Sequence, residues 1–106
     1  MKTFRTADLR PGIHYWHYTD TCTLQEFVCL SNKVEDGYAN ASIKWLHNPE
    51  LKEGESPIWD ICTEWFATFY ESKKDCILAQ VNETVEEAKR NHELAMDQIE
   101  HLLTLI

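Results

Sequence analysis

The C-terminal third of the chain, residues 72–106, reads SKKDCILAQVNETVEEAKRNHELAMDQIEHLLTLI. Its apolar residues recur at alternating intervals of three and four positions once one histidine is counted in the series. The members of this seam are Leu78, Val81, Val85, Ala88, His92, Ala95, Ile99, Leu102 and Ile106. A repeat of this kind, kept for about four heptads, is typical of a helix that packs along another helix. The pattern predicts one long helix over 72–106, capped at its start by Ser72.

The length of this helix predicts an association. At about 1.5 Å per residue it would be roughly 50 Å long, about twice the diameter of the compact body that precedes it. We therefore expect the chain to form a homodimer, or to pair with a partner helix, through one apolar face. That face comprises Val85, Ala88, His92, Ala95, Met96, Ile99, Leu102, Leu103 and Ile106. The alternative is a helix that bends back or breaks near Asn91 and packs on its own domain.

Charges along the same segment do not stabilise it locally. Glu83 and Glu87 stand four positions apart and repel each other on one helix face. His92 is the polar member of the seam, so it could set the register of a paired helix. If two copies of His92 met across a symmetric pair, protonation near pH 6.5 would loosen the contact. The alternative for His92 is a side chain that reaches solvent.

The preceding body, residues 1–71, contains all twelve aromatic residues, all three Gly and all three Pro. β-prone runs over 13–18, 24–30, 38–46, 58–62 and 64–70 predict strands, and Asp36-Gly37 predicts a hairpin turn. Within 38–46 the residues Ala39, Ala41, Ile43 and Trp45 alternate with polar ones, which predicts a half-buried antiparallel strand. The run 64–70 is apolar on both faces and is interpreted as a central strand.

The segment 6–12, Thr-Ala-Asp-Leu-Arg-Pro-Gly, resembles the opening of many small SH3-like barrels. Together these patterns predict a single α+β domain over 1–106. Its expected fold is a strongly bent antiparallel sheet or open SH3-like barrel of four or five strands, followed by one long C-terminal helix.

The net charge of −8 argues against binding to a phosphate backbone. It indicates either a partner with a basic surface or an acidic surface that only keeps the protein soluble. The acidic residues assigned to a partner-binding surface are Glu35, Asp36, Glu50, Glu53 and Glu55. Neither a signal peptide nor a membrane span is found, so a cytoplasmic location with reduced cysteines is expected.

Residues with catalytic or metal-binding chemistry are present but poorly spaced. His14 and His17, offered with Cys22 and Cys29 as a zinc set, fall on opposite faces of a strand. No base stands in a recognisable relation to Cys62, the thiol between Asp60 and Glu64. We therefore expect no enzymatic activity and no cofactor.

The aromatic run Tyr15, Trp16 and Tyr18 is assigned to an edge that contacts a partner protein. The alternative is a binding module for single-stranded nucleic acid or a small ligand that stacks on these rings. Small size, acidity, aromatic density and the absence of catalytic motifs resemble the small proteins that phages and mobile elements encode to block host enzymes or defence complexes, including anti-CRISPR inhibitors. Such a resemblance implies that the dispersed carboxylates occupy a basic nucleic-acid channel on a target. The expected function is that of a non-enzymatic interaction or regulatory protein.

Overall fold

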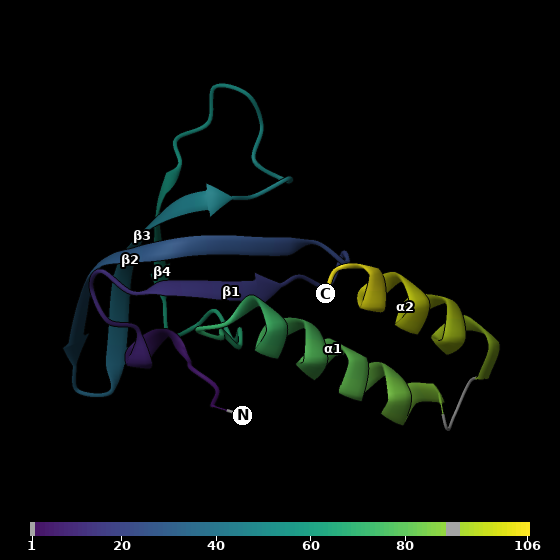
Figure 1. The fold of residues 1–106 in the computed structure, drawn as a ribbon. Coiled ribbons are helices and arrows are strands. Elements are labelled where there is room, and N and C mark those ends of the chain that lie inside the picture. Colours follow the sequence, from purple (N-terminus) through teal and green to yellow (C-terminus); the bar gives the residue numbers. More distant parts are fainter. Residues whose placement is uncertain (1, 89–91) are drawn as a thin grey trace.

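The computed structural model describes residues 2–88 and 92–106, with side chains described outside 88–97. The elements follow in the order η1 (Thr6–Asp8), β1 (His14–Tyr18), β2 (Leu24–Glu35), β3 (Tyr38–His47), β4 (Ile58–Cys62), α1 (Lys73–Ala88) and α2 (His92–Thr104). Figure 1 shows the sheet on one side and the two helices on the other. The predicted α+β class is confirmed.

The sheet is a meander in which β1, β2, β3 and β4 pair in chain order and every pair is antiparallel. The β2–β3 hairpin closes through Asp36 and Gly37, whose φ angles of 51° and 78° fit the left-handed conformations of a two-residue turn. Register shifts at Glu26/Phe27 and at Cys29/Ser31 mark irregularities that bend β2 across its length. The predicted hairpin and the bent sheet are therefore both observed.

The core lies on the inner face of this sheet and is mainly aromatic. Phe27 is fully buried, and its ring stands edge-to-face to Phe69 at 5.2 Å and to Trp45 at 5.5 Å between ring centroids. The predicted inner face of β3, from Ala39 to Trp45 at every second position, is buried as expected. Alternation along one strand was enough to identify this face because the opposite face is polar.

The predicted strand over 64–70 is not formed. In this segment only Phe69 and Tyr70 make bridges, to Phe4 and Trp16 respectively. The Trp16 amide donates to the Tyr70 carbonyl at 2.6 Å and the Tyr70 amide donates back to the Trp16 carbonyl at 3.0 Å. The rest of 64–70 is a connection in which Phe66 is exposed, whereas Ala67 is buried in the core and Trp65 packs against it. Apolar residues on both sides of a short run do not require strand pairing. The SH3-like form of the barrel stays a prediction.

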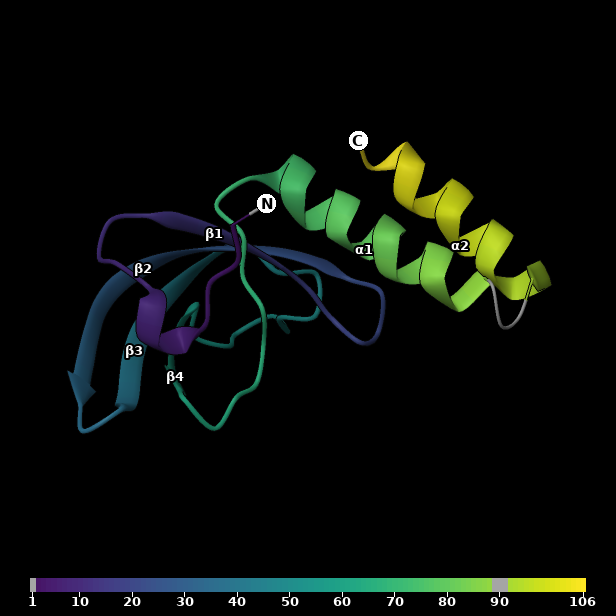
Figure 2. The same cartoon turned by 90° about the horizontal axis from the view of Figure 1, so that it is seen from below.

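The predicted long helix is corrected to two helices, which lie side by side and run in opposite directions (Figures 1 and 2). Ile77 near the start of α1 lines one depression with Leu105 and Ile106 after the end of α2. An apolar stripe needs a second helix to cover it, and here each half of the segment covers the other. The predicted cap is present, because the Asp75 amide donates to Ser72 Oγ at 3.3 Å.

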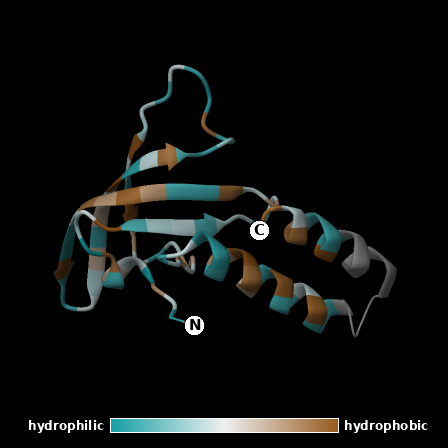
Figure 3. Ribbon diagram, in the orientation of Figure 1, coloured by the Kyte–Doolittle hydropathy of each residue, from teal (hydrophilic) through white to brown (hydrophobic). Residues whose placement is uncertain are grey.

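The helical hairpin packs against the β1 side of the sheet and has buried residues of its own. Cys76 and Ile77 of α1 are fully buried, and Leu102 of α2 is 3% exposed. Figure 3 shows apolar segments on both helices as well as along the sheet. Within the described residues, neither helix combines the length and the apolar content that crossing a membrane requires.

Candidate functional site

The residues of the predicted dimer face are divided by the fold. Leu102 is buried within its own chain and Ile99 is half-buried, whereas Val85, Leu103 and Ile106 are exposed. The side chains of Ala88, His92, Ala95 and Met96 lie outside those that the structure describes. The apolar face therefore serves, in part, to join α2 to α1 rather than to meet another chain.

The predicted acidic surface is also divided. Glu35 and Asp36 lie at the β2–β3 turn, where β3 begins, and Glu50, Glu53 and Glu55 lie in the loop that follows β3. These two groups occupy opposite ends of a strand of ten residues. All five are exposed, but the structure does not bring them together on one patch.

The predicted aromatic edge is occupied by the chain itself. Tyr15 is 1% exposed, its ring packs on Phe4 and Phe27, and its hydroxyl accepts a hydrogen bond from the Arg10 amide at 2.9 Å. Trp16 is half-buried and its backbone pairs with Tyr70. Tyr15 therefore belongs to the core, because it alternates with Trp16 and faces the inside of the sheet.

The residues weighed for metal binding and catalysis are likewise apart. His14 lies 3.5 Å from Glu26, while His17 packs edge-to-face on Trp65 and Phe69. Within the described part of the chain, no group of three or more His, Cys, Asp or Glu side chains is placed to hold a metal ion. Cys29 and Cys76 are buried, and burial raises the pKa of the Cys76 thiol to about 12.

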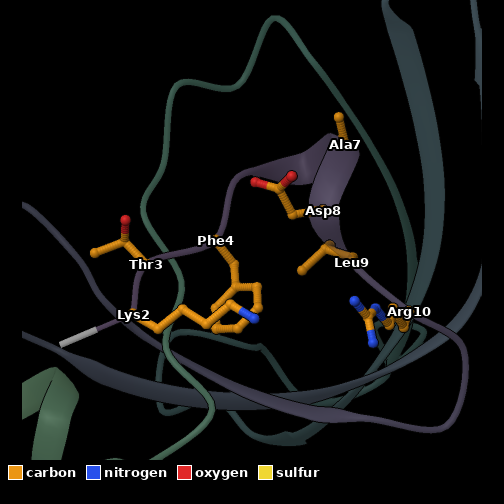
Figure 4. Close-up of a pocket in the computed structure, with 7 residues that line it drawn as sticks. All are labelled: Lys2, Thr3, Phe4, Ala7, Asp8, Leu9 and Arg10. Atoms are coloured by element: carbon orange, nitrogen blue, oxygen red, sulfur yellow. The ribbon is translucent and has the colours of Figure 1, made fainter.

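One depression of the surface is formed by the N-terminal segment alone (Figure 4). It has a volume of 440 Å³ and is lined by Lys2, Thr3, Phe4, Ala7, Asp8, Leu9 and Arg10. The Lys2 ammonium stands 5.3 Å from the centre of the Phe4 ring, and the Asp8 carboxylate accepts a hydrogen bond from the Arg5 amide. Its lining includes two cationic side chains, those of Lys2 and Arg10, but every lining residue belongs to the same terminal segment.

A larger groove lies where the sheet and the helical hairpin meet. Two adjoining depressions, of 280 and 400 Å³, share His17, Thr19, Asp20, Phe66 and Ala67 among their lining residues. One depression extends to Glu50 and Trp65, and the other extends along α1 and to Gln98 of α2. We call the two depressions together the Phe66 groove.

The Phe66 groove is strongly acidic. Its described lining residues include four carboxylates and neither Lys nor Arg; the carboxylates are those of Asp20, Glu50, Glu83 and Glu87. The salt bridges found among the described residues are His14–Glu26 and Lys33–Glu35, so none of the four is ion-paired there. Like charges gathered in a concave site attract a cation more strongly than the same charges spread over a surface.

Aromatic rings border these carboxylates. Phe66 is 86% exposed, an unusual state for the largest purely apolar side chain. Tyr18, Trp65 and Tyr70 also line the groove. Aromatic faces beside carboxylates form a site that suits a cationic group, because the ring face attracts positive charge.

His17 lines both depressions, and its surroundings favour the neutral ring. Its Nδ1 stands 3.2 Å from the Thr68 carbonyl, a separation at which a neutral ring donates a hydrogen bond. Burial lowers the pKa of His17 below its usual value, although the Thr68 carbonyl and the charges of Asp20 and Glu50 oppose that shift. At neutral pH His17 therefore adds no positive charge to the groove.

Most residues of the groove were missed by the sequence patterns, and Glu50 is the one predicted acidic residue that reaches it. The sequence did contain one indication of the groove: Glu83 and Glu87 stand four positions apart and place two like charges on one face of α1. Phe66 was assigned to a strand face, and nothing in the sequence predicted that its side chain would be exposed. Asp20 lies in the turn between β1 and β2. It becomes part of the groove only because the fold brings that turn close to α1.

Comparisons with known proteins leave the function to be argued from this geometry. No family model matches the chain, no curated protein matches it, and no solved structure matches it.

Proposed function

We propose that the chain is a non-enzymatic interaction protein that binds an exposed basic segment of a partner protein in the Phe66 groove. The observation that supports this most directly is the combination of four carboxylates with an 86% exposed phenylalanine in one groove. Arginine is the cation that fits best, because its planar guanidinium can pair with a carboxylate and stack on an aromatic face at the same time.

The charge of the groove also selects against other ligands. An anionic phosphate backbone would meet Asp20, Glu83 and Glu87 at close range, which opposes the alternative of single-stranded nucleic acid. The stacking platform expected for that alternative also loses Tyr15, which is buried. A basic polypeptide meets neither obstacle.

Two further expectations from the sequence are kept as proposals: an inhibitory role, which would use the groove, and a homodimer, which would use another surface. An inhibitor of a nucleic-acid-handling protein, of the kind that phages encode, would use the groove to occupy a basic segment that otherwise contacts nucleic acid. A homodimer would use the apolar side chains that the hairpin leaves exposed, namely Val85, Leu103 and Ile106. Light scattering on the intact chain distinguishes a dimer from a monomer of 12.5 kDa.

The proposal is tested by binding of a fluorescein-labelled Gly-Ser peptide that carries three arginines, measured by anisotropy at an ionic strength of about 0.15 M, where the Debye length is about 8 Å. Phe66→Ala should weaken binding about thirtyfold, as expected for loss of an aromatic anchor worth about 2 kcal/mol. The double variant Glu83→Gln/Glu87→Gln should weaken it about two- to thirtyfold, since each of the two exposed charge pairs contributes roughly 0.2–1 kcal/mol.

The matched control is Glu35→Gln/Glu53→Gln, which changes the net charge by the same amount at exposed positions outside the groove. Binding to this control should stay within about twofold of the parent protein, because charges beyond a Debye length are largely screened. Equal weakening by both double variants would show that the peptide responds to net charge, and the groove would then have no special role.

A further inference from the structure

We propose that a second, apolar cavity beside the Phe66 groove receives an apolar side chain of the same basic segment. This inference rests on the proposed function and specifies its partner: a segment that carries an arginine or lysine and, close to it in sequence, a leucine-like residue. The cavity has a volume of 210 Å³ and is lined by Tyr18, Cys22, Thr84, Gln98, His101 and Leu102.

The cavity is continuous with the groove. Tyr18, Cys22, Thr84 and Gln98 line both of them. A segment whose cation lies against Glu83 and Glu87 therefore passes the mouth of the cavity at Thr84, which directly follows Glu83 and lies three residues before Glu87. The two sites form one extended surface rather than two independent ones.

The size of the cavity decides what kind of group it takes. Pockets for small molecules usually measure about 300–1,000 Å³, and this one is smaller at 210 Å³. It suits a single side chain inserted from a longer segment, in the way that hot-spot residues fill pockets at protein interfaces.

The hydroxyls of Thr84 and Tyr18 in the wall are already engaged. The Thr84 hydroxyl donates to the Gln80 carbonyl at 2.8 Å within α1. Burial, together with a hydrogen bond to the Cys22 side chain, raises the pKa of the Tyr18 phenol to about 12 and leaves it neutral. Leu102 is 3% exposed and forms an apolar part of the wall, so an apolar side chain inserted beside it would be removed from water.

The test compares three labelled peptides of equal length: Arg with Leu, Arg with Ala, and Gly with Leu at the two positions. On the parent protein, the Arg–Leu peptide should bind about tenfold more tightly than the Arg–Ala peptide, the gain expected from burying one leucine. Thr84→Leu fills the cavity and should reduce this ratio to about one, while Thr84→Val keeps the volume and should preserve it.

An independent readout uses the exposed thiol of Cys22, which lines the cavity while Cys29 and Cys76 are buried. The Arg–Leu peptide should slow alkylation of Cys22 by iodoacetamide severalfold, and the Arg–Ala peptide should leave the rate nearly unchanged. Equal binding of the Arg–Leu and Arg–Ala peptides would overturn the inference while the proposed function stands.

Two other outcomes overturn it differently. If the Gly–Leu peptide binds as tightly as the Arg–Leu peptide, the requirement for a cation fails and the proposed function fails with it. If Cys22 becomes protected as the protein concentration rises without any peptide, a second copy of the chain occupies the cavity.

Discussion

The sheet body and the helical hairpin are stabilised by different kinds of burial. In the body, residues far apart in the chain meet in an aromatic core, where Phe27 contacts Tyr15, Trp45 and Phe69 and all are buried. In the hairpin, the fully buried side chains of α1 are small or aliphatic, and the apolar residues Val85 and Leu103 remain exposed. Both regions keep apolar side chains at the surface, among them Leu30, Ile58 and Phe66 of the body, so the difference between them lies in the kind of core.

This difference bears on function because the Phe66 groove is built from both regions. Asp20 and Phe66 come from connections of the body, and Glu83 and Glu87 come from α1. The arrangement of the groove therefore depends on how firmly the hairpin is held against β1. Variants that separate the stability of the two regions show which of them limits the site.

The largest effect is expected from Phe27→Ala. Removing this ring leaves a cavity beneath three aromatic partners, and such substitutions cost about 3–5 kcal/mol, a large part of the stability of a small domain. Urea denaturation followed by tryptophan fluorescence measures the loss. Phe66→Ala is the matched control: since Phe66 is exposed, its removal should change the free energy of unfolding by less than about 0.5 kcal/mol.

A smaller effect is expected from Leu102→Ala, which tests the hairpin. Leu102 is 3% exposed and its neighbour Leu103 is 53% exposed, so the two leucines differ in burial while they share composition and helix. Leu102→Ala should lower the free energy of unfolding by about 2 kcal/mol, at the low end of the range for buried leucines, and Leu103→Ala by less than about 0.5 kcal/mol. Denaturation curves at two protein concentrations give both values.

The opposite ranking would contradict the intramolecular hairpin. If Leu103→Ala costs as much as Leu102→Ala and the midpoint depends on protein concentration, then the exposed side of α2 lies in an interface between copies. That result would restore the dimer that the heptad pattern predicts.

The two regions also differ in how far their sequence could be interpreted. Strands β1, β3 and β4 were predicted nearly to the residue, because one side of β3 is polar and Gly or Pro residues separate the runs. β2 extends to Glu35, five residues beyond its predicted end. The run 64–70 misled because an apolar residue such as Phe66 counts equally toward a core and toward an exposed binding surface.

The hairpin was ambiguous for a different physical reason. A heptad pattern predicts that a second helix covers the apolar stripe, but it does not predict whether that helix comes from the same chain or from another one. Between Ala88 and His92 the sequence has no Gly or Pro that would indicate the end of a helix. The apolar repeat continues across this point, so one uninterrupted helix was predicted. The groove was hidden because its carboxylates come from three separate segments, and only the fold brings Asp20, Glu50 and Glu83 to one surface.

The smallest effect concerns pH and His17, which lines both depressions of the groove. Burial lowers the pKa of His17 in the folded state, so below about pH 6.5 the unfolded chain binds a proton that the folded chain resists. Stability contributed by neutral His17 is present above that pH and is lost as the pH falls through the folded value. We expect the free energy of unfolding to decrease between pH 7.5 and pH 5.5, by at most about 1.4 kcal/mol for each unit of depression.

His17→Asn isolates this contribution, because asparagine can still donate to the Thr68 carbonyl but does not titrate. The variant should be less stable than the parent at pH 7.5, since it loses the ring contacts with Trp65 and Phe69, yet its stability should fall less on acidification. The gap between the two proteins should therefore narrow toward pH 5.5. Parallel decreases would mean that the pH dependence arises from other groups, and His17 would then be a packing residue whose charge state does not matter to the fold.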